Sequence, residues 1–206
     1  DFGLSDEGGL ERVQTWHYPS RAECMVCHSR AANYVLGLCE LQMNCEVADG
    51  NGGRIGQLEL LEQLGYFSKP IGQPVSERQR LVPVDDETAS VSLRAASWLH
   101  ANCASCHVEA GGGNSQFSAE LTEMPEKRRL IDAVPVHSGF DLSNARLVAP
   151  GAPGNSVLLH RISRRDRSRM PPIGSLIPDP VGVALIRRWI EELPATGAEG
   201  STGSNQ

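Results

Sequence analysis

The chain has 206 residues and a formal net charge of −6, with 40% hydrophobic and only 5% aromatic residues. This length allows one or two small domains, and the negative charge argues against nucleic-acid binding. No apolar run approaches the ~20 residues that a membrane-spanning helix needs. No signal peptide is recognisable either, so we expect a mature or excised segment that begins at Asp1.

The first predicted helix begins after Ser20, a suitable N-cap residue, and Glu23 completes a capping box. This helix carries the motif Cys24-Met25-Val26-Cys27-His28. Cys-x-x-Cys-His is the attachment signature of c-type haem: two thiols one turn apart each add to a haem vinyl group, and the histidine becomes an iron ligand. A redox dithiol, a disulfide or half of a zinc site are the alternatives.

Two further cysteines, Cys39 and Cys45, lie six residues apart after this motif. In an oxidising compartment they could close a small disulfide loop. The alternative is a pair of free buried thiols. We expect the disulfide.

The next segments predict a domain boundary. A turn is expected at residues 49–53 and a short helix at residues 57–64, with Gly65 as its C-cap. Prolines and scattered charges follow. We therefore predict an N-terminal domain over residues 1–75, a linker over 76–86, a second domain over 87–194 and a flexible tail over 195–206.

A helix over residues 91–100, capped by Thr88 or Ser90, leads into the second motif, Cys103-Ala104-Ser105-Cys106-His107. The 75 residues between Cys27 and Cys103 far exceed the gap of about 15–20 typical of a zinc ribbon. Both motifs carry histidine at the same offset, which a four-cysteine zinc site does not need. The sequence therefore predicts two covalently attached c-type haems.

The second half continues with loops, a helix over residues 157–162 capped by Ser156, the turn Met170-Pro171-Pro172 and an amphipathic helix over 181–193. This order resembles a small class I cytochrome c domain, in which methionine is the sixth iron ligand and the first and last helices cross. The resemblance implies that His107 and Met170 are the iron ligands, a pair that raises the haem potential. We expect a mainly α fold of two small haem-binding domains, the C-terminal one class I cytochrome c-like, with long irregular loops.

The whole chain also resembles the dihaem c-type cytochrome module of planctomycete-like secreted proteins, over about residues 16 to 193. Matching segments are residues 16–24, 35–37, 98–103, 147–151, 156–161 and 169–172. This resemblance implies a cytochrome located in the periplasm or outside the cell. Cys39 and Cys45 depart from the usual pattern of the module.

The sixth ligand of the first haem is left open by the sequence. We favour His100, because a ligand three residues before Cys103 would tie the two haems together, and the resembled module tends to carry histidine there. His17, Met43 and His137 are alternatives, as is an open iron site.

Five arginines crowd the approach to Met170: Arg161, Arg164, Arg165, Arg167 and Arg169. One hypothesis is a basic patch that steers an acidic redox partner or pairs with haem propionates. The other is a solvated loop in an arginine-rich chain.

The function predicted from these features is an electron carrier, not an enzyme, that passes single electrons between redox protein partners such as a dehydrogenase, outside the cytoplasm. We expect no nucleic-acid partner and no transmembrane segment, and the chain could form an oligomer. The alternatives are a dihaem peroxidase-like enzyme, a subunit of a haem-stacked assembly, or a structural protein with zinc sites.

Overall fold

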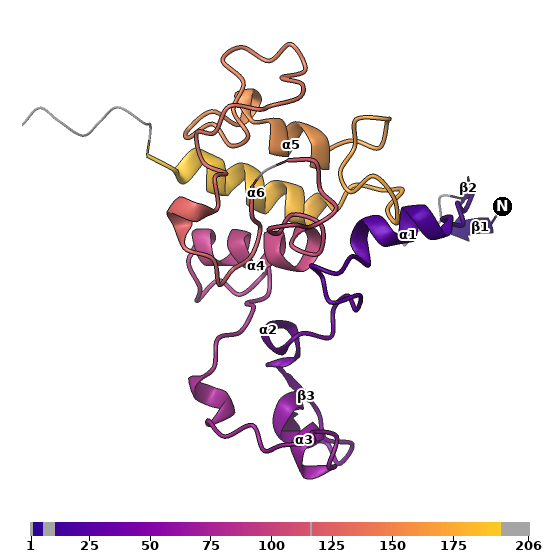
Figure 1. Cartoon of the computed structure of the whole chain (residues 1–206), viewed down its shortest axis with the longest axis vertical. Helices are drawn as coiled ribbons and strands as arrows, with labels where there is room; N and C mark the ends of the chain where they lie inside the picture. Colours follow the sequence, from indigo (N-terminus) through magenta and orange to yellow (C-terminus); the bar gives the residue numbers. More distant parts are fainter. Residues whose placement is uncertain (1, 6–10, 116, 195–206) are drawn as a thin grey trace, which may run out of the picture.

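The computed structural model of the chain describes residues 2–5, 11–115 and 117–194 (Figure 1). The predicted flexible tail, residues 195–206, lies outside the described residues. The helices are α1 (Arg21–Cys27), α2 (Glu40–Met43), α3 (Gln57–Gln63), α4 (Val91–Cys103), α5 (Val157–Ile162) and α6 (Pro180–Glu192). The strands are β1 (Phe2–Ser5), β2 (Glu11–Gln14), β3 (Glu46–Ala48) and β4 (Arg54–Gly56), and short 3-10 helices cover Val75–Glu77, Pro125–Lys127 and Pro153–Asn155.

The helices predicted from the sequence are confirmed, and so are most of their caps. The Ser20 hydroxyl accepts from the backbone N–H of Glu23, whose carboxylate accepts from the Ser20 backbone in return. Ser90, not Thr88, caps α4. At the start of α5 the Ser156 hydroxyl makes no cap bond and instead accepts from the backbone N–H of Ala149.

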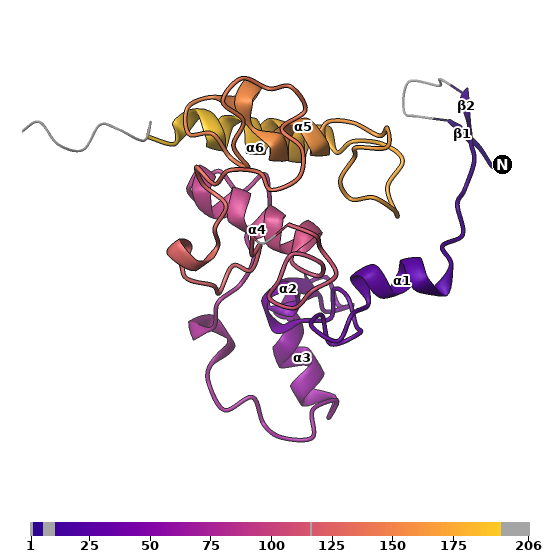
Figure 2. The same cartoon turned by 45° about the horizontal axis from the view of Figure 1, so that its top comes forward.

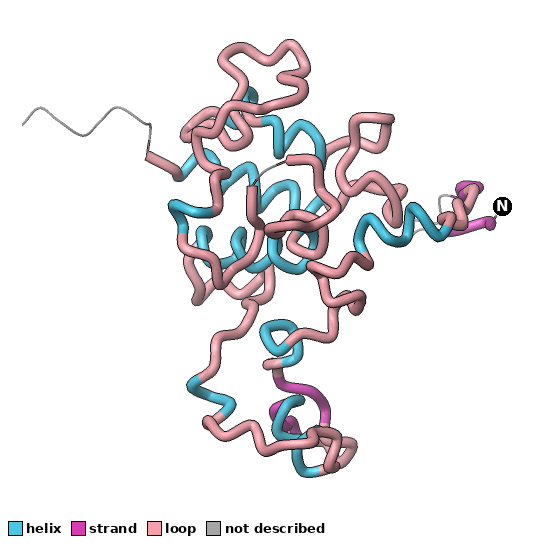
Figure 3. The backbone as a smooth tube through the Cα atoms, viewed as in Figure 1, coloured by secondary structure: helices cyan, strands magenta, loops and turns pink. Residues whose placement is uncertain are grey.

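Two antiparallel hairpins, β1–β2 and β3–β4, hold all the strands of the described residues. The second was predicted only as a turn, because its strands are three residues long and show no extended alternation. Asp49 closes it by accepting from the backbone N–H groups of Asn51 and Gly53. Figure 3 shows that long loops, drawn in pink, connect α4 to α5.

The hydrophobic core lies where α4, α5 and α6 pack together (Figures 1 and 2). Each helix buries one apolar face, as its sequence periodicity requires. Fully or almost fully buried side chains of the core include Ala95 and Leu99 of α4, Leu159 and Ile162 of α5, and Ile186 and Ile190 of α6.

The crossing of α4 and α6 is fixed by a tryptophan, an aspartate and a glycine. The indole N–H of Trp98 in α4 donates to Asp179 at 2.9 Å, and Asp179 is the N-cap of α6. Gly182 lies beneath the indole, where a Cβ atom would overlap the ring. The glycine therefore allows the helices to approach closely.

The N-terminal part has very little core of its own. Among the side chains described between residues 11 and 90, only Asn44 and Leu58 are buried. Asn44 donates to the carbonyl oxygens of Val75, Arg78 and Gln79 and so organises this region through polar contacts. Burial of apolar area is the main source of folding free energy, so this part depends on contacts with other groups.

The predicted linker, residues 76–86, makes hydrogen bonds to both parts of the chain. The backbone N–H of Leu81 donates to the carbonyl of Leu41, and that of Val82 donates to the hydroxyl of Ser97 in α4. The segment is therefore hydrogen-bonded near its middle to both parts of the chain.

The expected disulfide between Cys39 and Cys45 is not formed in this structure. Both thiols are free. The α2 helix lies between them, and the two side chains have different partners: Cys39 donates to Gln42 and Cys45 donates to Gln57.

Replacing Gly182 with alanine tests the helix crossing. The new methyl group would overlap the Trp98 indole, and we expect a loss of about 1–3 kcal/mol in the free energy of unfolding, although alanine is favoured in helices by about 1 kcal/mol. Urea denaturation followed by circular dichroism measures this. Gly154→Ala is the control, because its Cβ would meet no atom within 4 Å. Equal midpoints for both variants would contradict the proposed role of Gly182.

Candidate functional site

The second Cys-x-x-Cys-His motif opens into a cavity of about 660 Å³. Helix α4 ends at Cys103, and the next turn brings the backbone N–H groups of Cys106 and His107 back to the Cys103 carbonyl at 3.1 and 2.8 Å. Cys103, Cys106 and His107 all line the cavity, and so does Met170. The structure thus brings together residues that the sequence predicted to act on one cofactor, although they are up to 67 residues apart (103 to 170).

The cavity has mainly apolar walls with a few polar groups, and its volume lies within the range of roughly 300–1,000 Å³ seen for ligand and cofactor sites. Its apolar lining includes Phe117, Leu130, Leu147, Val157, Leu158, Ile162 and Val183. Such a cavity suits a large apolar group that carries a few charges.

His107 is buried at the cavity, and its ring has the chemistry of a metal ligand. Its ring stacks on Phe117 with a centroid distance of 4.3 Å, and its Nδ1 atom is buried with no hydrogen-bond partner. Burial lowers the pKa of His107 below its usual value of 6.5, so the ring is neutral at pH 7 and keeps a lone pair. Gly113 leaves the room that the ring needs, since a Cβ there would lie 2.9 Å from Nδ1.

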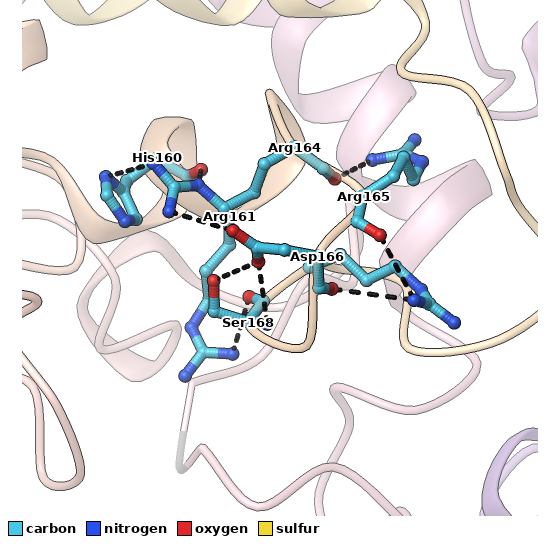
Figure 4. Close-up of polar contacts among 7 residues, drawn as sticks. His160, Arg161, Arg164, Arg165, Asp166 and Ser168 are labelled. Carbon is cyan, nitrogen blue, oxygen red and sulfur yellow. Dashed lines mark hydrogen bonds and ion pairs between the residues drawn. The ribbon is translucent and has the colours of Figure 1, made fainter.

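Met170 lies in a loop that arginine side chains hold in shape, and Figure 4 shows polar contacts of the segment that precedes it, over residues 160–168. The backbone N–H of Met170 donates to the carbonyl of Arg161. The Arg165 guanidinium donates to the Ser175 hydroxyl and to carbonyl oxygens on both sides of Met170, those of Ile162, Arg164 and Ile177. One side chain therefore joins the end of α5 to the segment after the Met-Pro-Pro turn.

Three other arginines of this cluster also donate to backbone carbonyls. Arg161 donates to Ser168 and lies over the Phe140 ring, Arg169 donates to Pro172, and Arg164 donates to His160 and pairs with Asp166. Arg167 is exposed. The cluster is therefore more ordered than a solvated loop, and Arg161 and Arg165 also line the cavity. Steering of a partner by this surface stays a prediction.

The first motif lies on α1 and the turn after it. The His28 ring places Nδ1 2.8 Å from the carbonyl oxygen of Tyr34, so Nδ1 carries the proton and donates, and Nε2 keeps its lone pair. Metal-ligating histidines commonly make this second bond. His28 is exposed, and so are the large side chains that follow it, Tyr34 and Val35. These side chains are open to solvent, whereas the apolar side chains of the second site line a cavity.

The two motifs meet. Cys27 of the first motif lines the same cavity as the second motif, and its sulfur lies 3.0 Å from that of Cys106. Burial, followed by the hydrogen bond with Cys106, raises the pKa of Cys27 to about 12, and burial raises that of Cys103 to about 12. Both thiols therefore stay protonated at neutral pH.

Two candidates for the sixth ligand of the first site, His100 and His17, each have a local partner. His100 Nδ1 accepts from the backbone N–H of Leu121, which places the proton of the neutral ring on Nε2, 4.0 Å from the Cys39 sulfur. Iron binding through that Nε2 would require the proton to leave or the ring to turn. His17 pairs with Glu23. The role of His100 as a ligand stays a prediction.

The two remaining candidates lie against different cavities. Met43 lines a second cavity, of about 400 Å³, beside Leu58 and Phe67. His137 lines the cavity of the second motif, with Nε2 3.1 Å from the Asn114 carbonyl oxygen.

A four-cysteine zinc site would need Cys24 and Cys103 to join the close pair of Cys27 and Cys106. Among residues 2–5, 11–115 and 117–194, no group of three or more His, Cys, Asp or Glu side chains is arranged to hold a metal ion.

None of the helices in the described part of the chain has the length and apolar composition that crossing a membrane requires.

Several functional features were not predicted from the sequence. Phe117 comes from a loop with no periodicity, and the role of Arg165 depends on carbonyl groups that only the folded loop brings together. A signal did exist for Gly112 and Gly113, because glycines directly after a ligand motif often mark a close approach of backbone. Nothing in the sequence indicated that Cys27 would lie beside Cys106.

Comparison with known proteins adds no relative: no protein-family model, no curated protein and no solved structure matches this chain.

Replacing Arg165 with alanine tests the loop that carries Met170. Loss of its hydrogen bonds should ease local opening by about 1.5 kcal/mol or more, which corresponds to at least about tenfold faster trypsin cleavage after the nearby Arg167. Mass spectrometry of timed digests measures this rate. Arg188→Ala is the control, since Arg188 forms only an exposed pair with Glu192. Equal cleavage rates in both variants would show that Arg165 does not hold this loop in place.

Proposed function

We propose that the protein is a dihaem c-type cytochrome that carries single electrons between redox partners. The observation that carries this proposal is the shared cavity: two thiols, a neutral histidine and a methionine, from segments far apart in sequence, line one apolar space. Thiols for covalent attachment and a His/Met pair for iron are the donor set of a c-type haem. A haem bound there would supply reversible one-electron chemistry.

Several residues around the second site would hold the haem, each through a different contact. Cys103 and Cys106 would bind it covalently, and His107 and Met170 would supply nitrogen and sulfur to the iron. Arg161 and Arg165 place positive charge at the cavity wall, where carboxylate groups of a bound haem would be favoured. The apolar walls would exclude water from it.

The first motif supports a second haem. Cys24 and Cys27 provide the two thiols, and His28 has its Nε2 lone pair free for iron because Nδ1 donates to Tyr34. A haem at this site would cover the exposed apolar side chains of this region, among them Tyr34, Val35 and Leu36. The closeness of Cys27 and Cys106 would place the two groups side by side, which favours electron transfer within one molecule.

We infer a carrier in preference to an enzyme, with redox proteins such as a dehydrogenase as partners. The proposed covalent haem attachment and the resemblance to secreted modules support a place in the periplasm or outside the cell. The net charge of −6 disfavours nucleic acid as a partner. A peroxidase-like enzyme would instead need an open iron site and would react with peroxide.

Intact mass spectrometry under denaturing, reducing conditions tests the proposal, on the chain produced together with the cytochrome c maturation machinery. A mass increase of two haems supports it, because thioether bonds survive this treatment and bound zinc does not. No increase would overturn it. An increase of one haem would restrict it to one motif, and Cys24→Ser/Cys27→Ser and Cys103→Ser/Cys106→Ser variants would show which.

Replacing Met170 with alanine should open one iron position at the second haem only. The reduction potential of that haem should fall, since methionine ligation raises it, and added imidazole should bind there. Visible spectroscopy and a redox titration measure both effects. Met124→Ala is the control, because Met124 is exposed and does not line the cavity. An unchanged spectrum in Met170→Ala would exclude Met170 as a ligand.

A further inference from the structure

The contact between Cys27 and Cys106 links two motifs that are 79 residues apart. The sulfurs are 3.0 Å from each other, and the Cys106 thiol also lies 3.4 Å from the carbonyl oxygen of Val26. Both cysteines are partly buried and both are free. Among the described residues, no other cysteine pair forms a sulfur–sulfur hydrogen bond, and this includes the two cysteines within each motif.

Backbone packing holds this contact in place. Gly112, in the loop that follows the second motif, lies against the Val26 backbone so closely that a Cβ atom at Gly112 would overlap the Val26 carbonyl. The end of α1 is thus fixed against the second motif one residue before Cys27. The sulfurs are close because the two backbones are close, and not because one flexible side chain happens to reach across.

We propose that Cys27 and Cys106 form a disulfide bond in the haem-free chain. Such a bond is about 2.05 Å long, so the sulfurs need to approach by only about 1 Å. The two thiols lose two protons and two electrons as the S–S bond forms. A disulfide-containing oxidant, such as oxidised glutathione or a thiol–disulfide oxidoreductase, accepts the electrons while its own S–S bond breaks to give two thiols.

The bond would attach α1 covalently to the C-terminal core. This matters because the N-terminal part buries so few side chains of its own. A cross-link that closes a long loop restricts the unfolded chain strongly. The haem-free chain would therefore keep its two motifs together before any cofactor is attached.

A consequence follows that rests on the proposed function. Each thioether bond needs a free thiol, and this one disulfide would withdraw a cysteine from both motifs at once. Reduction of a single bond would then make both motifs ready for attachment, and attachment at either motif would prevent the bond from forming again.

Peptide mapping of the full-length, haem-free chain tests the proposal. The chain is treated with oxidised glutathione and a metal chelator at mildly alkaline pH, its free thiols are blocked, and it is digested with trypsin without reduction. Trypsin releases the motifs on separate peptides, residues 22–30 and 95–127. We expect these two peptides to be joined. The mass should lie two hydrogen atoms below the sum of the two peptides when each carries one blocked cysteine, Cys24 or Cys103.

Matched variants identify the cysteines involved. In Cys24→Ser/Cys103→Ser the joined peptide should persist, because Cys27 and Cys106 remain. In Cys27→Ser/Cys106→Ser it should be lost, and circular dichroism checks that both variants keep their helices. Oxidation in guanidinium chloride should also remove the joined species, because the contact belongs to the folded chain.

Three results would overturn the proposal: disulfides confined within each motif, thiols that stay free, or a joined peptide that persists without Cys27 and Cys106. These outcomes are separate from the haem count. A chain that takes up two haems but forms no such bond would refute the disulfide alone, and a chain that forms the bond but takes up no haem would refute the proposed function alone.

Discussion

The crossing of α4 and α6 is the contact on which the candidate site depends. Helix α4 ends at Cys103, so its position fixes the second motif, and α6 closes the core behind it. Trp98 and Asp179, whose hydrogen bond joins the helices, also line the cavity. A change in the crossing would therefore alter the cavity wall directly, and the absence of a side chain at Gly182 contributes to the shape of the site.

The positive charge around Met170 is compatible with an ordered loop because the arginine guanidinium groups donate hydrogen bonds to backbone carbonyls. A buried carbonyl without a partner is costly, and a loop of this irregular shape cannot satisfy its own. Burial lowers the pKa values of Arg161 and Arg165, yet from a reference of 12.5 these side chains keep their charge at neutral pH. The same two residues can thus shape the loop and present charge to the cavity.

Features set by residues that are close in sequence were predicted well, and contacts between segments that are distant in sequence mostly were not. Local signals located the helices well: Ser20 with Glu23 at α1, Ser90 at α4, and the amphipathic pattern of α6. The β3–β4 hairpin was missed because three-residue strands carry little pattern. Contacts that arise only on folding were missed as well, including the oxygen acceptors of Arg165. The disulfide expected between Cys39 and Cys45 is not formed. Cys103, Cys106, His107 and Met170 could be grouped from sequence because their order and spacing resemble a known domain.

The meeting of Cys27 and Cys106 bears on how the chain is divided. The sequence suggested two haem domains separated by a linker, each with its own centre. In the structure the last turn of α1 reaches the cavity of the second motif, while His28 and Tyr34 at the first motif are exposed. Since the N-terminal part buries so few side chains of its own, its stability depends on contacts with the rest of the chain such as this junction. The proposed haems would then bind to one joint unit, in which occupancy of either site would stabilise the arrangement required by the other.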